Sequence, residues 1–239
     1  MKKIILLLVL TTFAIINAQD KKAYQLFDKK GKKVNFSKVV KAGFKTEVIL
    51  FGEFHDNPIC HWLQLELTKE MSSKKEVVLG AEMIEADNQM QLNEYLNGKI
   101  TQKQLDSAAR LWPNYKTDYK PLVDLAKAKK IPFIATNIPR RYASMVHKKG
   151  FESLLELTPQ EKSWIAPQPI AYDKDLPGYK EMMTMMGEHT SVNMPKAQAS
   201  KDATMAYFIS KNVKQNSVFI HYNGSFHSDN FDGINWYLR

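Results

Sequence analysis

Cysteine is almost absent from this chain, because Cys60 is the only one among 239 residues. A single cysteine excludes an internal disulfide, so packing must hold the fold together. With 44% hydrophobic residues the chain can build one domain with a full core, and it lacks the internal repeats and low-complexity linkers that would indicate more. A buried thiol is the simplest role for Cys60, and a nucleophilic pair with the adjacent His61 is the alternative.

Long apolar runs are absent outside the first residues, which read MKKIILLLVLTTFAIINAQ. A lysine pair, an apolar run and small residues up to Ala18 are typical of a secretory signal peptide. A membrane anchor is the alternative, but the run is shorter than the roughly 20 residues that span a bilayer. We expect residues 1–18 to be cleaved and residues 19–239 to be exported, to the periplasm or the outer cell surface, without a transmembrane segment. No cysteine lies near the cleavage site, which excludes lipid attachment of the bacterial lipoprotein kind.

A dense basic patch is also absent, although the formal net charge is +9. Loss of Lys2 and Lys3 with the signal peptide leaves 32 basic against 25 acidic residues. The surplus is spread over DKKGKK, SSKK, KAKK and HKKG, without the interleaved aromatic residues of a nucleic-acid binder. The charge therefore argues against a nucleic-acid partner and supports only weak attraction to anionic surfaces or ligands.

Four apolar, β-branched runs predict strands buried on both faces: TEVILF at 46–51, EVVLGAEMI at 76–84, IPFIATN at 131–137 and SVFIHYN at 217–223. Helical patterns lie between or before them, at 58–71, 87–96 with Asp87 as a cap, 118–129 and 196–214. This alternation predicts an α/β fold, a single domain whose mostly parallel sheet carries helices on both faces. The chain ends inside the apolar pattern INWYLR, which leaves room for a further strand beyond Arg239.

Polar clusters follow each predicted strand, as GEFHD, EMIEAD, TNIPRR and NGSFHSD. Because the carboxyl ends of parallel strands share one edge of the sheet, His55 and His227 should be neighbours there despite their separation in sequence. Two of the clusters repeat Gly-x-x-His, from Gly52 to His55 and from Gly224 to His227. Glycine allows the sharp bend at the strand end and lets a ligand approach the backbone.

The chemistry of these clusters has several interpretations. Each could simply cap the helix that follows it. Imidazole beside carboxylate also suits zinc, manganese or iron, or a proton-transfer pair, although the spacing matches no defined zinc pattern. The predicted metal ligands are His55, His227 and Glu53, and Glu82 is the acidic group on the third strand end.

Five separated blocks resemble one family: GEFHDNPICHWLQ, AEMIEADNQMQLNEYLNG, LWPNYKTDYKPLVDLAKAKKIPFIATNIPRRYASMV, KAQASKDATMAYFI and HYNGSFHSDNFDGINWYL. In this order, over roughly residues 40 to 239, they resemble the ChaN-like haem-binding uptake proteins of the Tiki superfamily. The superfamily shares the paired Gly-x-x-His motif with Tiki-type metalloproteases and erythromycin-esterase-like hydrolases. The resemblance implies an α/β fold, export, haem binding and homodimers that enclose paired haems. It places the polar centre at Glu53, His55, Glu82 and His227, with Asn137 and Arg140 in the same cleft.

The segment from 166 to 194 is unusual, because it begins with several prolines and carries methionines at 182, 183, 185 and 186. We expect a mobile insertion, with three interpretations: flexible core filling, a wall for a large flat ligand such as haem, or a Cu(I) site of methionine and His189. Phenolate and imidazole both bind ferric haem, so Tyr172, Tyr179 and His189 are the predicted axial donors.

Two functional hypotheses therefore follow from the sequence. In the first, an exported protein binds haem for haem or iron uptake, with the insertion and the strand-end histidines as its pocket. In the second, a divalent metal at the strand ends serves a peptidase or esterase, and Glu53 or Glu82 is the general base. The sequence favours haem binding.

Overall fold

The computed structural model describes residues 22–186 and 191–239, and the chain divides into units of residues 1–35 and 36–239. The predicted signal peptide therefore lies outside the described residues. In the first unit, β1 (Leu26–Phe27) pairs antiparallel with β2 (Lys33–Val34). Gly31 closes the turn between them with a φ of 72°, a left-handed conformation that glycine adopts without strain.

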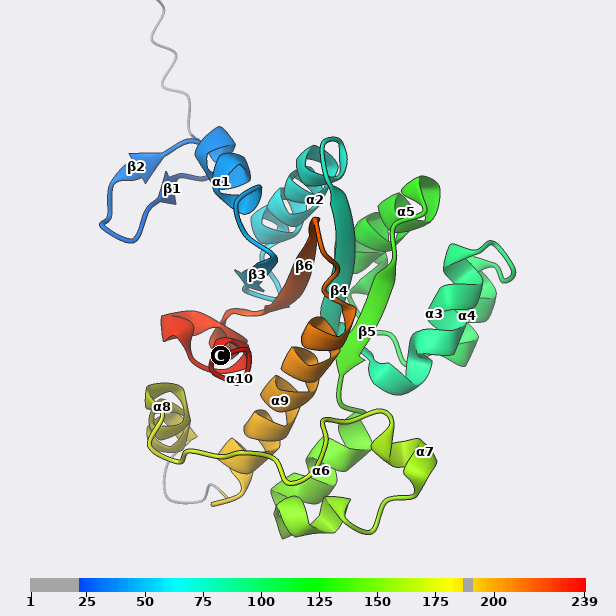
Figure 1. The fold of residues 1–239 in the computed structure, drawn as a ribbon, viewed down its shortest axis with the longest axis vertical. Helices are drawn as coiled ribbons and strands as arrows, with labels where there is room; N and C mark the ends of the chain where they lie inside the picture. The colour runs from blue at the N-terminus through cyan, green and yellow to red at the C-terminus, as the bar shows by residue number, and fades with distance from the viewer. Residues whose placement is uncertain (1–21, 187–190) are drawn as a thin grey trace, which may run out of the picture. The chain divides into compact units, whose positions relative to one another are not determined.

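The second unit is built on a parallel sheet of four strands (Figure 1). In spatial order these are β3 (Val48–Glu53), β6 (Ser217–Gly224), β4 (Glu76–Glu85) and β5 (Phe133–Asn137). Each predicted run forms one of them. The two central strands, β6 and β4, are buried almost throughout, whereas β3 is half-buried because it lies at an edge.

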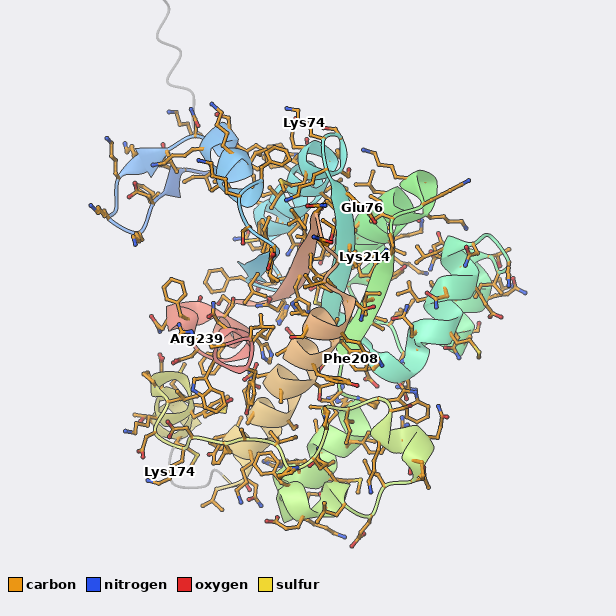
Figure 2. All side chains as sticks on the ribbon, viewed as in Figure 1. Lys74, Glu76, Lys174, Phe208, Lys214 and Arg239 are labelled. Atoms are coloured by element: carbon orange, nitrogen blue, oxygen red, sulfur yellow. The ribbon has the colours of Figure 1, made fainter. Side chains whose placement is uncertain are left out.

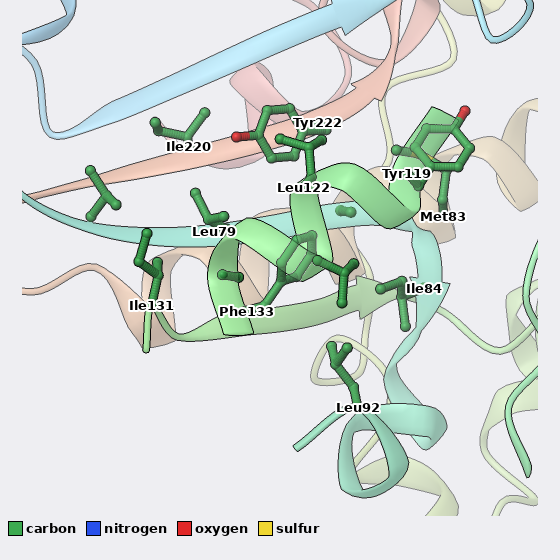
Figure 3. Packing of buried hydrophobic residues seen from close by; sticks show 14 of the residues in the cluster. Leu79, Met83, Ile84, Leu92, Tyr119, Leu122, Ile131, Phe133, Ile220 and Tyr222 are labelled. Carbon is green, nitrogen blue, oxygen red and sulfur yellow. The ribbon is translucent and has the colours of Figure 1, made fainter. Parts of the chain in front are cut away.

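Alternate side chains of the central strands pack into cores on opposite faces of the sheet. Leu79 and Ile220 pack with Leu122 of α5 (Lys120–Lys129), as Figure 3 shows. On the other face, Val78 and Phe219 pack against α9 (Met194–Asn212). The sequence-based prediction of an α/β fold with helices on both faces is confirmed.

The helices that matter for the site begin close to their predicted positions. The longer helices are α1 (Phe36–Gly43), α2 (Pro58–Ser72), α3 (Gln89–Leu96), α5, α6 (Arg140–Lys149), α8 (Pro177–Met186) and α9; short ones are α4 (Gln102–Ala108), α7 (Pro159–Lys162) and α10 (Ile234–Tyr237). Asn57 caps α2 by accepting the N–H groups of Ile59 and Cys60. Asp87, predicted to cap α3, instead forms ion pairs with Arg110 and Arg141. That cap prediction was wrong because a tertiary charge contact outcompetes the local one.

The predicted insertion contains an irregular segment followed by α8. Ala166 and Ile170 of the irregular part are buried in a core with residues of α6. Met182 and Met183 are half-buried and Met185 is largely exposed. His189 lies outside the described residues, so the copper interpretation stays a prediction.

An exposed ion pair lies at the amino-terminal end of β4. Lys214 lies 3.5 Å from the carboxylate of Glu76 at the start of β4, and both side chains are more than half exposed (Figure 2). Such an exposed pair contributes little stability. Within the described residues, no helix is long and apolar enough to cross a membrane.

Gly80 provides a test of packing in the centre of the sheet. A Cβ at this position of β4 would lie 2.7 Å from the ring of Phe219 and 3.0 Å from Cγ2 of Thr136. Both neighbours are fully buried, so we expect Gly80→Ala to lower the free energy of unfolding by about 1–3 kcal/mol. Urea unfolding measures this, with Gly178→Ala as the control, since its added Cβ would meet nothing closer than 3.7 Å. Equal stability of the two variants would contradict the packing described here.

Candidate functional site

A cavity of about 1060 Å³ lies at the carboxyl ends of the four strands. Its walls come from the ends of β3, β4, β5 and β6, from residues 110–113, and from α9. Among its lining residues are six of the predicted site residues: Glu53, His55, Glu82, Asn137, Arg140 and His227. The structure thus brings together groups from distant parts of the sequence, and their individual roles stay predictions.

His55 is oriented by Glu53 at the end of β3. Its Nδ1 lies 2.9 Å from Oε1 of Glu53, which is buried, whereas the imidazole is 40% exposed. The ring edge packs on Trp112, with centroids 4.8 Å apart. The hydrogen bond to Glu53 raises the pKa of His55, although burial opposes the shift. Among the described residues, no hydrogen bond engages Nε2 of His55, so this nitrogen is available to a ligand.

A second layer of polar groups holds Glu53 in place. The hydroxyl of Tyr119 donates to Oε1 of Glu53 at 2.7 Å, and the amide of Gln64 donates to Oε2. Burial and the neighbouring Glu53 raise the pKa of Tyr119 well above its usual range, so the phenol stays a donor. Tyr119 precedes α5 and Gln64 belongs to α2. Sequence reasoning missed both, because their register on these elements carries no local signal of a site.

The two Gly-x-x-His motifs interlock through their glycines. Residues 53 and 224 are paired neighbours in the β3–β6 register. A Cβ on Gly224 would lie 2.6 Å from Nε2 of His55, and a Cβ on Gly52 would lie 3.0 Å from Cα of Ser225 in the second motif. Each glycine thus leaves space for the loop of the other motif, which explains why the pattern occurs twice.

His227 lies beneath the cavity between two buried carboxylates. Its Nδ1 is 2.5 Å from Asp202 of α9, and its Nε2 is 3.1 Å from Glu82 of β4. Burial alone would lower the pKa of His227, but the two carboxylates raise it to about 10. His227 is therefore an imidazolium at neutral pH, and both nitrogens donate. In this arrangement both ring nitrogens are engaged by carboxylates.

Glu82 and Asp202 respond differently to the same imidazolium. Burial would raise the pKa of Glu82, but His227, Lys201 and the N–H of Gly224 at 2.8 Å lower it well below its usual range. Burial dominates at Asp202 and raises its pKa. Of these two carboxyl groups, Glu82 therefore loses its proton more readily and carries the negative charge at the cavity wall. Asp202 was missed by sequence reasoning, since a lone aspartate within a helical pattern is usually a solvated residue.

The insertion reaches this cluster through Tyr179 of α8. Its hydroxyl donates to Oδ2 of Asp202 at 3.1 Å, and burial together with Asp202 raises its pKa far above the usual range. Tyr172 stacks on Tyr179 with centroids 5.7 Å apart. Neither tyrosine is among the residues that line the cavity in the described part of the chain. To ligate iron, Tyr179 would have to leave Asp202 and lose its proton, and the axial-donor prediction for both tyrosines stays a prediction.

The remaining walls are apolar on one side and cationic on another. Phe54, Leu111, Trp112 and Phe226 supply apolar surface, and Phe54 is 67% exposed. Arg110 is paired with Glu85 at 2.9 Å. Arg140 and Lys201 also line the cavity. Trp112 and Lys201 were not predicted, although the Leu-Trp-Pro-Asn segment, which interrupts the helical patterns, was a usable signal for the first.

The predicted divalent-metal site gains no support from the side-chain arrangement. Over residues 22–186 and 191–239, no group of three or more histidine, cysteine, aspartate or glutamate side chains is placed to hold a metal ion. His227 is occupied by its two carboxylates, and Nδ1 of His55 is occupied by Glu53. The metal ligand set of His55, His227 and Glu53 stays a prediction.

Comparison with solved structures supports the fold. The structure described as cofacial haem binding to ChaN of Campylobacter jejuni matches with a TM-score of 0.69 and 18% identity, over 92% of this chain and 86% of the other. The structure of RRSP, a MARTX toxin effector domain from Vibrio vulnificus, matches with a TM-score of 0.52 and 13% identity, over 84% of this chain and 32% of the other. At such identities these matches show the fold alone.

Comparison at the level of sequence families is more specific. No curated protein sequence matches this chain significantly. The family described as haem-binding uptake, Tiki superfamily, ChaN, matches residues 39–238, which include every described residue of the cavity wall. With its four-stranded parallel sheet and its interlocked Gly-x-x-His motifs, this chain belongs to the ChaN family of the Tiki superfamily.

Proposed function

We propose that this protein binds haem in the cavity at the strand ends and serves haem or iron uptake as an exported protein. The observation that carries the proposal is His55, which lines the cavity: its Nδ1 is held by the buried Glu53, and its Nε2 has no hydrogen bond among the described residues. Family membership supports haem as the ligand, because the family's description is haem-binding uptake.

The residues around His55 fit a haem ligand. Metal-binding histidines characteristically donate their second ring nitrogen to a carboxylate or carbonyl, which fixes the tautomer and makes the ligating nitrogen more basic. Glu53 supplies such a partner. Haem iron accepts a single histidine as its protein ligand, and it would supply the redox and ligand chemistry of the bound group. We therefore propose that His55 would hold the haem iron, and not Tyr179, whose phenol is bound to Asp202.

The walls of the cavity fit the rest of the macrocycle. A volume of about 1060 Å³ lies just above the range of small-molecule pockets, roughly 300–1,000 Å³, as a large ligand requires. Trp112 and Phe226 offer flat apolar surface, and Arg140 and Lys201 also line the cavity. An uptake protein must also release its haem. A single imidazole on the iron allows release more readily than two protein ligands, one on each face of the haem.

A homodimer that encloses paired haems is part of the proposal. Phe54 lines the cavity and is 67% exposed, so a second copy placed over the cavity mouth would remove this ring from water. The Campylobacter relative is described by cofacial haem binding. Sedimentation of the protein with and without haem tests this point, and a haem complex that remains monomeric would overturn the dimer.

Haem titration tests the proposed function. Ferric haem added to the purified protein should give a shifted Soret band that saturates at about one haem per chain and survives gel filtration. His55→Ala should change the spectrum and weaken binding by at least about tenfold. His147→Ala is the matched control, since His147 is an exposed histidine of α6 outside the cavity.

Three further variants separate the insertion from the strand-end pocket. Tyr172→Phe and Tyr179→Phe should leave the spectrum unchanged if His55 is the ligand, and His189→Ala should do the same. A spectral change in one of these, with none in His55→Ala, would move the iron ligand to the insertion. Nonsaturable binding that no variant affects would overturn the proposed function and favour the hydrolase hypothesis.

A further inference from the structure

The two edges of the parallel sheet differ in how their backbone groups are paired. β5 forms one edge and β3 forms the other (Figure 1). At β5, the amide of Gln89 takes the place of a neighbouring strand, because its oxygen accepts the N–H of Ala135 at 2.6 Å and its nitrogen donates to the C=O of Phe133 at 2.9 Å. Unpaired edge groups are a template for pairing with another chain, and Gln89 covers them here.

The edge at β3 is open. The C=O of Glu47 accepts an N–H of β6 at 2.8 Å, so alternate residues from Glu47 onward face β6. The N–H and C=O groups of Val48, Leu50 and Gly52 therefore point away from it. The hydroxyl of Thr46 donates to the C=O of Val48 at 2.9 Å, but the backbone groups of Leu50 and Gly52 have no hydrogen-bond partner on this side among the described residues. Neither residue is charged or proline, and the register with β6 is regular, so the devices that usually block an edge strand do not act here.

A second cavity, of about 690 Å³, lies along this open edge, and we call it the edge groove. It is lined by the three residues of β3 whose backbone groups point outward. Its other apolar residues are Val213 at the end of α9, Leu238 at the end of α10, and Phe231. Phe231 is 65% exposed, and its φ of 61° is one that bulky residues rarely adopt. Such strained residues are concentrated at functional sites, which suggests a binding role for this rim.

The edge groove suits a single extended segment better than a second folded copy. Paired strands lie about 4.8 Å apart, so two copies could join their β3 strands only if both edges protruded. The open edge instead lines a hollow whose other residues come from α9, α10 and the segment around Phe231, and two such rims would meet before the strands. A separate strand without walls of its own can enter the hollow and reach the backbone groups of Leu50 and Gly52.

The charged residues of the edge groove favour a basic occupant. They are Glu47, Asp229 and Arg239, and none of these forms an ion pair among the described residues. Two carboxylates against one guanidinium attract a segment of positive charge. Glu47 precedes β3, whereas Asp229 follows Ser228, whose Oγ would lie 3.1 Å from a Cβ on Gly52 near the other end of the strand. The two carboxylates therefore lie towards opposite ends of the open edge.

We infer that β3 accepts an extended segment of a partner polypeptide as an additional strand of the sheet. Main-chain hydrogen bonds to Leu50 and Gly52 hold the segment, and its alternate, apolar side chains enter the edge groove. Basic residues near its ends meet Glu47 and Asp229. This surface goes beyond the proposed haem function and does not depend on it.

Titration of the purified protein with a synthetic peptide tests the inference. The probe is a short peptide of alternating valine and threonine, with a lysine at each end and blocked termini. By NMR, the amide signals of Leu50 and Gly52 should shift, and their hydrogen exchange should slow at least about tenfold at saturation, because both N–H groups gain acceptors. Unchanged exchange at these two amides would overturn the inference.

Two N-methylated forms of the same peptide distinguish strand pairing from mere apolar contact. In one form alternate backbone amides are methylated, and in the other the remaining amides are. Only one set of alternate N–H groups can face β3, so one form should bind at least about tenfold more weakly and the other should bind like the parent peptide. Equal affinity of the two forms would overturn the added strand, and this measurement needs no variant of the protein.

Variants of the protein locate the bound peptide. Leu50→Pro removes an outward N–H without removing a bond to β6, and it should weaken peptide binding at least about tenfold. Glu47→Gln/Asp229→Asn should weaken it about threefold or more at low salt and less at high salt. Glu70→Gln removes an exposed charge outside the edge groove and should have no effect.

Circular dichroism and haem titration of each variant separate this inference from the proposed function. All the variants should keep the fold and the haem affinity of the unmodified protein. If haem binds saturably and the peptide does not bind, the edge groove is wrong and the proposed function stands; if only the peptide binds, the reverse holds. A haem-free dimer that Leu50→Pro dissociates would show that a second copy covers β3, and it would overturn the peptide segment as the occupant.

Discussion

Replacing His227 with alanine should lower the free energy of unfolding by about 3–5 kcal/mol, the usual cost of removing one member of a buried charged network. His227 lies between Asp202 at 2.5 Å and Glu82 at 3.1 Å, and all three side chains are buried. Without the imidazolium, two carboxylates would share a buried space with no cation between them. Urea unfolding at pH 7 measures the loss, and His147→Ala should unfold like the unmodified protein.

The same cluster should make stability depend on pH in the alkaline range. The pKa of His227 is about 10 in the folded protein, above the ordinary value of about 6.5 that applies to the unfolded chain. A raised folded-state pKa means that the stabilisation is complete below about pH 6.5 and is lost as the pH rises towards 10. The stability difference between the unmodified protein and His227→Ala should therefore shrink over this interval. A difference that stays constant from pH 6 to about 10 would show that His227 is neutral in the folded state.

Glu53→Gln should weaken haem binding by about 10–100-fold, the range seen when the partner of a metal-binding histidine is changed. Glu53 accepts hydrogen bonds from His55, Tyr119 and Gln64. A glutamine amide in its place offers one acceptor oxygen, so an N–H group must face one of these three donors. His55 also loses the carboxylate that raises its pKa, so its Nε2 becomes a poorer ligand.

A charge-matched variant and a pKa measurement identify the cause of any loss. Glu66→Gln makes the same chemical change on α2, at a residue paired with Lys69 on the surface, and should leave haem binding unchanged. In the haem-free protein, NMR titration should find a lower pKa for His55 in Glu53→Gln than in the unmodified protein. An unchanged His55 pKa and unchanged haem affinity would remove Glu53 from the site.

Much of the fold could be predicted from local pattern. Four β-branched runs became the four strands, since residues buried on both faces of a parallel sheet must be apolar throughout. The Asp87 cap was predicted wrongly, because the charges it meets, Arg110 and Arg141, lie elsewhere in the sequence. In the final apolar pattern INWYLR, residues Ile234–Tyr237 form the short helix α10.

For the candidate site too, the sequence predicted one part and the tertiary structure decided the other. Glu53, His55, Glu82 and His227 were identifiable from the sequence alone, because polar residues directly after apolar strands must lie at the carboxyl edge of a parallel sheet. Only the tertiary structure decided that β6 lies between β3 and β4, which interlocks Gly52 and Gly224 and separates the roles of the two histidines. His55 lines the cavity, and its Nε2 has no hydrogen bond within the described part of the chain, whereas His227 is enclosed by Glu82 and Asp202. A local motif specifies which groups reach the edge, but burial and charge partners depend on strand order and on helix register, and these are set by packing between distant segments.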